Sequence, residues 1–214
     1  LFALHVRAAG QGQAFLVAQA GWGADAAQAA QAAYGEIARV LQDQGLTIAH
    51  ERLFGSLTVK SAVMASRAAA LRAKNLPADG PITYIQGHPP WGEGFAGAII
   101  QAVSCRHPQD EVWTISHQGK AVGRGWRRQG ATFLLLQNIQ GLALGPQGVT
   151  TPFIQTRRML QRAERIFESQ GASYRDVVRT WFYLSDILAW YPEFNRSRTA
   201  IYGQFGILPG QDNG

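Results

Sequence analysis

The sequence predicts an α+β protein built from two tandem ββαβαββ units, each a mixed sheet with two helices on one face. Two observations lead to this fold class. Short apolar segments with a period of two, typical of strands, alternate with longer segments that have the 3.6-residue period of a helix. This order begins again after a polar connector at residues 106–110, and the two halves are similar in sequence. We therefore expect one unit at residues 1–108 and a second at residues 109–214.

The first half begins with two short strands, at residues 1–6 and 14–20. A helix follows at residues 26–44, with Asp25 as its N-cap and Gly45 at its end. The remaining predicted elements are a strand, a helix and two closing strands, at residues 51–59, 61–73, 82–86 and 97–104.

The second half repeats this order. Strands are predicted at residues 111–116 and 132–137, and the glycine-containing residues 123–126 between them are interpreted as a turn. A helix begins at Thr151, with Pro152 in its first position. The last predicted elements are a strand at residues 178–184 and a helix that follows the cap residue Asp186, contains Phe194 and ends at Gly206.

Corresponding places in the two halves carry similar short sequences. Three pairs of segments correspond: residues 14–19 and 132–137, 43–45 and 169–171, and 66–71 and 197–202. The last pair places Arg67 and Arg198 at equivalent positions. The second half stops at Gly214, where the first half enters its closing strands, so we expect the second unit to lack these strands in this sequence. Because the chain begins with Leu1 rather than Met, we expect it to be part of a longer protein.

The stretch from residue 176 to 206 carries the most specific pattern. It contains Asp-Val-Val-Arg-Thr at residues 176–180, Asp186-Ile187, and Phe194-Asn195 followed by Tyr202. This pattern resembles the Rid/YjgF superfamily, also named endoribonuclease L-PSP, whose fold is chorismate-mutase-like. The resemblance implies association as a trimer or pseudo-trimer of units, with ligand sites in the clefts between them. A sheet with one helix-free face must bury that face, so we expect a homo-oligomer.

Two fused units in one chain also resemble the chorismatases. The pattern Arg179-x-Trp181-x-Tyr183 is similar to the Arg-x-Trp-Asn-Tyr strand of that family, but Phe182 stands in place of the asparagine. The resemblance implies a glutamate near the C-terminus as the acid for enol-ether cleavage. Rid imine deaminases instead use an arginine at the start of a closing strand. Residues 81–84 contain no arginine, and the equivalent place in the second unit lies beyond Gly214.

Five residues of the second half are candidates for substrate binding. Asn195, Arg198 and Tyr202 share a helical face, where an amide, a guanidinium and a phenol can hold a carboxylate and a hydroxyl. The alternative is structural, with Arg198 paired to Glu193 or to a backbone carbonyl. The other two candidates, the aromatic residues of the 178–184 strand, either line a cleft or pack a subunit interface: Trp181 and Tyr183.

His88, Trp91 and Glu93 lie on a Gly/Pro-rich loop of the first half. A histidine and a glutamate can perform general acid–base catalysis if they converge. Their spacing of five residues on a loop predicts no convergence, so a solvated loop with a docked tryptophan is the default interpretation.

The bulk properties exclude several classes of protein. The formal net charge is +6, without a block of like charges, so an anionic ligand is expected and nucleic acid is unlikely as a partner. One cysteine, Cys105, leaves no internal disulfide and no metal-ligand spacing, which favours a cytoplasmic protein without a metal. No apolar run approaches the length of a membrane span.

The sequence therefore predicts a Rid/YjgF-type protein that binds or hydrolyses a small carboxylate-bearing metabolite, in the manner of an enamine or imine deaminase, at clefts between units. No cofactor is implied. The alternatives are a chorismatase-like lyase or hydrolase, an RNA-binding or endoribonuclease-like protein, and a non-catalytic ligand-binding protein. Whether the chain is an enzyme stays open at this point.

Overall fold

The computed structural model describes residues 2–9, 12–21, 23, 25–90, 92–104, 110–141 and 151–208. This part of the chain has a mixed α+β architecture, with four α-helices and two sheets. It divides into two compact units, Leu1–Asn138 and Ile139–Gly214. The expected division at residue 108 concerns repeated modules rather than compact units, and it stays a prediction. Trp91 and Cys105 lie outside the described residues.

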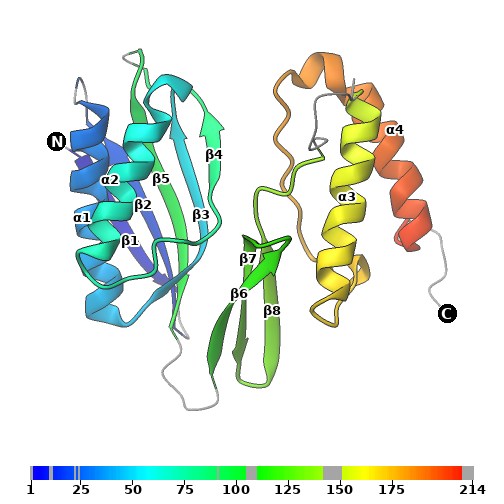
Figure 1. Ribbon diagram of the computed structural model, residues 1–214, viewed down its shortest axis with the longest axis horizontal. Helices are drawn as coiled ribbons and strands as arrows, with labels where there is room; N and C mark the ends of the chain where they lie inside the picture. Colours follow the sequence, from blue (N-terminus) through cyan, green and yellow to red (C-terminus); the bar gives the residue numbers. More distant parts are fainter. Residues whose placement is uncertain are drawn as a thin grey trace. The chain divides into compact units, whose positions relative to one another are not determined.

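The first unit contains a five-stranded sheet of order β1-β2-β5-β3-β4. β4 runs parallel to β3 and the other neighbouring pairs are antiparallel, so the sheet is mixed. Figure 1 shows the two helices of this part side by side on one face of the sheet. The elements are β1 (Phe2–Ala9), β2 (Gln13–Ala20), α1 (Ala26–Gln44), β3 (Thr47–Gly55), α2 (Lys60–Arg72), β4 (Thr83–Gln86) and β5 (Phe95–Val103).

Helix α1 forms as the sequence predicts. The Asp25 side chain accepts a hydrogen bond from the Gln28 amide at 3.0 Å, and Gly45 ends the helix in the left-handed conformation with φ 60°. The buried stripe of the helix is rich in alanine, which lets its backbone approach the sheet closely. On the sheet, β2 alternates buried residues with exposed ones, such as Leu16 at 0% and Phe15 at 40% exposure. The core of the unit therefore lies between the helices and one face of the sheet.

A second sheet follows, with the antiparallel strands β6 (Glu111–His117), β7 (Lys120–Arg128) and β8 (Ala131–Leu136). The predicted turn at residues 123–126 is wrong, because these residues are the middle of β7. Their glycines serve packing instead. A Cβ atom on Gly125 would overlap the Trp113 ring, and one on Gly123 would overlap the Leu135 carbonyl.

The side-chain amide of Gln137 ties the second sheet to the first within this unit. Its Oε1 accepts from the Glu51 amide at 3.1 Å, and its Nε2 donates to the Glu51 carbonyl at 2.8 Å. The register of β4 on β3 begins only at Arg52, so the Gln137 amide takes the place of a neighbouring strand at Glu51. Trp126 of β7 adds an apolar contact through a small buried cluster with Ala49 and Val103.

The second unit contains two packed helices, α3 (Pro152–Glu168) and α4 (Ile187–Phe205), and a short 3₁₀ turn at Tyr174–Asp176. Thr151 caps α3 by accepting from the Ile154 amide at 3.3 Å, and Asp186 caps α4 by accepting from the Ala189 amide at 3.2 Å. The predicted helix start at Thr151 and the predicted cap Asp186 are confirmed, as is the left-handed Gly206 at the end of α4. A buried cluster of Leu160, Tyr174 and Ile201 holds the helices together.

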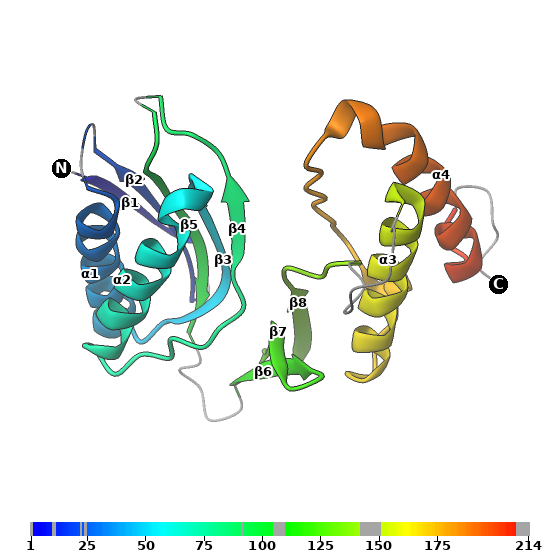
Figure 2. The same ribbon diagram turned by 45° about the horizontal axis from the view of Figure 1, so that its top comes forward.

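The strand predicted at residues 178–184 does not form. The segment is extended but belongs to no sheet in the described part of the second unit (Figure 2). In the first unit, β3 is hydrogen-bonded on both edges by strands that follow it in the chain, β4 and β5. No later strand follows residues 178–184 within the described residues, so the segment lacks the ladder that would make it a strand. Val178 is consequently fully exposed.

Candidate functional site

Three strand ends meet at one edge of the five-stranded sheet. β3 ends at Gly55, which lies opposite Gln86 at the end of β4 and Phe95 at the start of β5. Residues that follow β3 are therefore close to the loop that joins β4 to β5. This topology brings side chains together that are more than thirty positions apart in the sequence, as the Ser56–His88 contact shows.

A polar cluster of Ser56, Thr58, His88 and Glu93 occupies this edge. His88 Nδ1 lies 3.3 Å from Ser56 Oγ and 3.4 Å from Glu93 Oε1. Thr58 Oγ1 donates to Glu93 Oε2 at 2.5 Å. The prediction that His88 and Glu93 do not converge is thus wrong. Gly92 and Gly94, at φ 112° and 155°, adopt backbone conformations that favour glycine and let the loop fold back on itself.

Ser56 fixes the base of the cluster. It is 1% exposed, and its Oγ accepts a hydrogen bond from the Gly94 amide at 2.9 Å. Its carbonyl accepts from the Tyr84 hydroxyl, also at 2.9 Å. Sequence reasoning missed both Ser56 and Thr58, because neither belongs to a recognisable local motif. Only the pairing of β3 with its neighbours shows that they face the loop.

The hydrogen bond from Thr58 holds the pKa of Glu93 below its ordinary value, and Ser56 and the charge of His88 contribute in the same direction. Glu93 is therefore an ionised carboxylate that can accept a hydrogen bond from His88 Nδ1–H. Ser56 and Glu93 approach the same ring nitrogen, so the cluster is not a serine–histidine–acid triad, in which they would face opposite nitrogens. It is instead a carboxylate–imidazole pair, and the contacts of the imidazole within the described part of the chain are made through Nδ1.

The cluster is accessible, and a cation lies over the ring of Tyr84, which donates to Ser56. The side chains of His88 and Glu93 are 56% and 59% exposed, so a ligand can reach them. Lys60, at the start of α2, is also exposed, and its Nζ lies 5.4 Å from the centroid of the Tyr84 ring. Burial raises the pKa of Tyr84, so its hydroxyl stays protonated and donates to Ser56.

The candidates on the predicted strand of the second unit are half exposed. Trp181 and Tyr183 have 48% and 49% of their surface accessible, and the Cζ atom of Arg179 lies 4.3 Å from the centroid of the Trp181 ring. Whether they line a ligand cleft or a subunit interface stays a prediction.

The three candidates on α4 have separate surroundings. Arg198 Cζ lies 5.3 Å from the centroid of the Phe194 ring, and Tyr202 packs against Tyr174 with ring centroids 5.6 Å apart. Asn195 Oδ1 is buried without a hydrogen-bond partner among the residues that the structure describes. Glu193, the expected partner of Arg198, pairs with Arg196 at 2.7 Å instead. The substrate-binding role of these residues stays a prediction.

No group of three or more His, Cys, Asp or Glu residues in the described ranges is arranged to hold a metal ion. None of the helices in the same ranges combines the length and the apolar character that a membrane crossing needs.

The chain was compared with known protein families, curated proteins and solved structures. No protein-family model and no curated protein matches the chain. A solved structure described as "Crystal structure of Chorismatase at 1.08 Angstrom resolution" matches 79% of this chain with a TM-score of 0.57 and 16% sequence identity. The chain shares its fold with this chorismatase. It covers 59% of the length of that protein. None of these comparisons supports the Rid/YjgF family.

Proposed function

We propose that the chain is a chorismatase-like lyase or hydrolase that cleaves a small enol ether bearing a carboxylate. The observation that carries the proposal is the convergence of His88 and Glu93, 3.4 Å apart and accessible, on a fold shared with a chorismatase. Enol-ether cleavage needs a group that gives up a proton and then takes one back, which a histidine oriented by a carboxylate does well.

His88 acts first as the acid. With Nδ1–H held by Glu93, its Nε2–H gives a proton to the methylene carbon of the enol ether, and the electron pair of the double bond forms the new C–H bond. Water then adds to the resulting oxocarbenium carbon and returns a proton to Nε2. The hemiketal hydroxyl then loses its proton to form the keto group, its C–O bond to the ether oxygen breaks, and a proton passes to that leaving oxygen, so that pyruvate and an alcohol are released. No cofactor takes part in this sequence.

Lys60 supplies the cation for the substrate carboxylate. It lies beside Tyr84, whose hydroxyl is bonded to Ser56 of the same cluster. An exposed ammonium attracts a carboxylate without the cost of burying an unpaired charge. The role of this residue is substrate binding rather than proton transfer.

We propose that the second half is a second unit of the same type, supported by the similarity of residues 66–71 to residues 197–202. We also propose that units associate as a homo-oligomer with ligand clefts between them. The helix-free face of the first sheet supports this, because Phe15 and Val17 there are each 40% exposed.

The test is release of pyruvate from chorismate by the full chain, followed with a coupled dehydrogenase. We expect time-dependent pyruvate that scales with protein concentration, and separation of the second product distinguishes lyase from hydrolase action. Lys60→Gln should raise KM more than it lowers kcat, whereas Lys120→Gln, in the exposed hairpin of β6 and β7, should change neither. Absence of pyruvate with a folded chain would overturn the proposal.

A further inference from the structure

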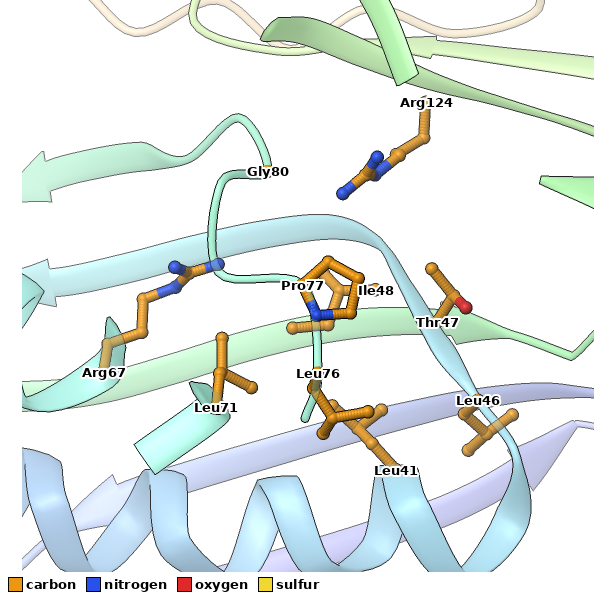
Figure 3. Close-up of a pocket in the computed structure, with 10 residues that line it drawn as sticks. All are labelled: Leu41, Leu46, Thr47, Ile48, Arg67, Leu71, Leu76, Pro77, Gly80 and Arg124. Atoms are coloured by element: carbon orange, nitrogen blue, oxygen red, sulfur yellow. The ribbon is translucent and has the colours of Figure 1, made fainter. Parts of the chain in front are cut away.

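The core of the first unit is closed where α1, α2 and β3 meet, but it is open at one edge of the sheet. The hollow between these elements has a volume of about 10 Å³, which one water molecule fills. Figure 3 shows Arg67 and Arg124 at this hollow, and each has an acidic partner, Glu51 and Asp79 respectively. The hollow therefore takes no larger ligand. The open place is the outer edge of β1, the first strand in the sheet order.

Val6 marks the opening of the core at this edge. It lies directly opposite Leu16 of β2, so the two side chains are on the same face of the sheet, the one that the helices cover. Leu16 is fully buried, whereas Val6 is 41% exposed. Leu4, on the same face, is only partly buried against the core. Apolar surface thus continues to the end of the sheet, where its burial needs a further element.

The backbone of β1 is able to add another strand. β1 pairs with β2 over eight residues without a register shift, and it has no neighbour on its other side among the described residues. It contains neither proline nor lysine, two residues by which proteins block pairing at an edge. β4, at the opposite edge of this sheet, is only four residues long, and a short edge strand resists such pairing. Of the two edges, β1 is therefore the one that accepts a partner strand.

We infer that a second copy of the chain covers this edge, with the two β1 strands antiparallel about a two-fold axis at His5. An axis perpendicular to the sheet keeps the helices of both copies on one side. On that side Val6 lies opposite Leu4 of the partner subunit, so an apolar side chain closes each opening. On the other side Arg7 lies opposite Ala3 of the partner subunit, so the two guanidinium groups do not oppose each other. The edge is thus complementary to itself.

Moving the axis by one residue gives a poorer match. With the axis at Val6, Arg7 would lie opposite His5 of the partner subunit, and these two side chains repel each other when the imidazole is protonated. With the axis at Leu4, the ladder would be confined to residues 2–6, whereas an axis at His5 pairs residues 2–8. The axis at His5 therefore combines the longest ladder with the best-matched side chains.

This pairing is separate from the chemistry and from the association proposed above. The His88 cluster lies at the ends of β3 and β4, on the other side of the sheet order from β1, so it stays accessible in the dimer. The contact is made by a strand edge rather than by the helix-free face of the sheet. The inference can therefore fail while the proposed function stands, and the reverse.

The test is sedimentation velocity of the full chain from about 1 to about 200 µM. We expect a monomer–dimer equilibrium with a dissociation constant on the order of 10 µM, because one added ladder is a small interface. Val6→Lys places an ammonium group against Leu4 of the partner subunit and should raise this constant at least about tenfold. Val17→Lys is the matched control, because Val17 is 40% exposed but lies on the helix-free face, and it should keep the dimer.

Disulfide cross-linking tests the register, and it also decides the matter if Val6→Lys does not fold. In a chain that carries Cys105→Ser, His5→Cys brings two thiols directly opposite each other at the axis, so oxidation should give a covalent dimer. Arg7→Cys on the same strand and face should stay monomeric, because its partner is Ala3. A mixture of Arg7→Cys and Ala3→Cys chains should cross-link to each other.

Four results would overturn the inference. The chain could stay monomeric at about 200 µM, or its mass could grow past two copies, as a head-to-tail contact predicts. Val17→Lys could abolish association while Val6→Lys keeps it, which would assign the contact to the helix-free face. Arg7→Cys could cross-link with itself as readily as His5→Cys. None of these measurements involves chorismate, so none depends on the proposed enzymatic function.

Discussion

Arg67 and Arg198 stand at equivalent positions of the predicted repeat but have different surroundings. Arg67 is 2% exposed and bonded to both oxygens of Glu51, which is itself fully buried. Arg198 is half-buried and lies over the Phe194 ring. The difference arises from the segment that precedes each helix. β3 is paired on both edges, whereas residues 178–184 are paired on neither edge among the described residues. A repeated helix sequence therefore does not guarantee a repeated environment; the neighbouring strand must be in place.

The comparison can be tested by replacing each of the two arginines with alanine and measuring the free energy of unfolding. Arg67→Ala leaves the Glu51 carboxylate buried with Tyr34 as its remaining side-chain partner, so we expect a loss of about 3–5 kcal/mol in the free energy of unfolding. Arg198→Ala should cost about 0.5–1 kcal/mol, because it removes a half-exposed cation–π contact. Urea denaturation measures both. Equal losses would show that the two surroundings do not differ as described.

A double variant controls for packing. Arg67→Met combined with Glu51→Leu removes both buried charges together and should recover most of the stability lost in Arg67→Ala. If the double variant is as unstable as the single one, the loss comes from the shape of the site rather than from the unpaired charge.

The next largest loss of stability is expected when the side-chain amide of Gln137, which supports β3, is removed. Gln137→Leu leaves the buried amide and carbonyl of Glu51 without partners, so we expect a loss of about 2–4 kcal/mol. Hydrogen exchange at the Glu51 amide should rise with it. Unchanged stability and protection would mean that the Gln137 amide does not substitute for a strand.

A smaller loss of stability is expected from a substitution in β7, the strand that was not predicted from the sequence. Gly125→Ala places a methyl group against the Trp113 ring inside the second sheet, and we expect a loss of about 1–3 kcal/mol. Gly35→Ala is the matched control, because Gly35 lies in α1 with open space around it and should gain about 0.5–1 kcal/mol. If Gly125→Ala leaves the free energy of unfolding unchanged, the assignment of residues 123–126 to β7 is contradicted and the predicted turn is favoured.

A further effect is a pH dependence in β3. Burial, with a contribution from Arg52, lowers the pKa of His50 to about 4 in the folded chain, against about 6.5 when unfolded. The unfolded chain therefore binds the proton first. The stability that His50 contributes is present above pH 6.5 and is lost between about pH 6.5 and 4. In urea titrations across this range, His50→Gln should lose less stability than the wild type; parallel losses would contradict the assignment.

Local sequence signals predicted the helices and their caps better than the sheets. Asp25, Thr151 and Asp186 cap helices as expected, because a cap depends on residues within one turn. Strand β7 was missed because its glycines indicate a turn unless the packing of Trp113 is known. The 178–184 strand was predicted from alternation alone, although a strand also needs a partner that the sequence does not identify.

Prediction of the candidate site from the sequence was limited in the same way. The sequence pointed to His88 and Glu93 through their loop, but Ser56 and Thr58 follow β3 and meet the loop only through strand pairing. The Glu51–Arg67 pair could likewise not be predicted from the sequence, because its members lie sixteen positions apart on different elements. Contacts between elements, rather than spacing within them, assemble both clusters.

The acid–base role of His88 can be tested by the rate of pyruvate release from chorismate by His88→Asn. Asparagine keeps a polar side chain but cannot transfer a proton, so we expect the rate to fall by about 10²–10⁴-fold, with unchanged stability. His5→Asn, an exposed position on β1, is the control and should keep the wild-type rate. A His88→Asn rate equal to the wild type would contradict the assignment of His88 as the acid–base group.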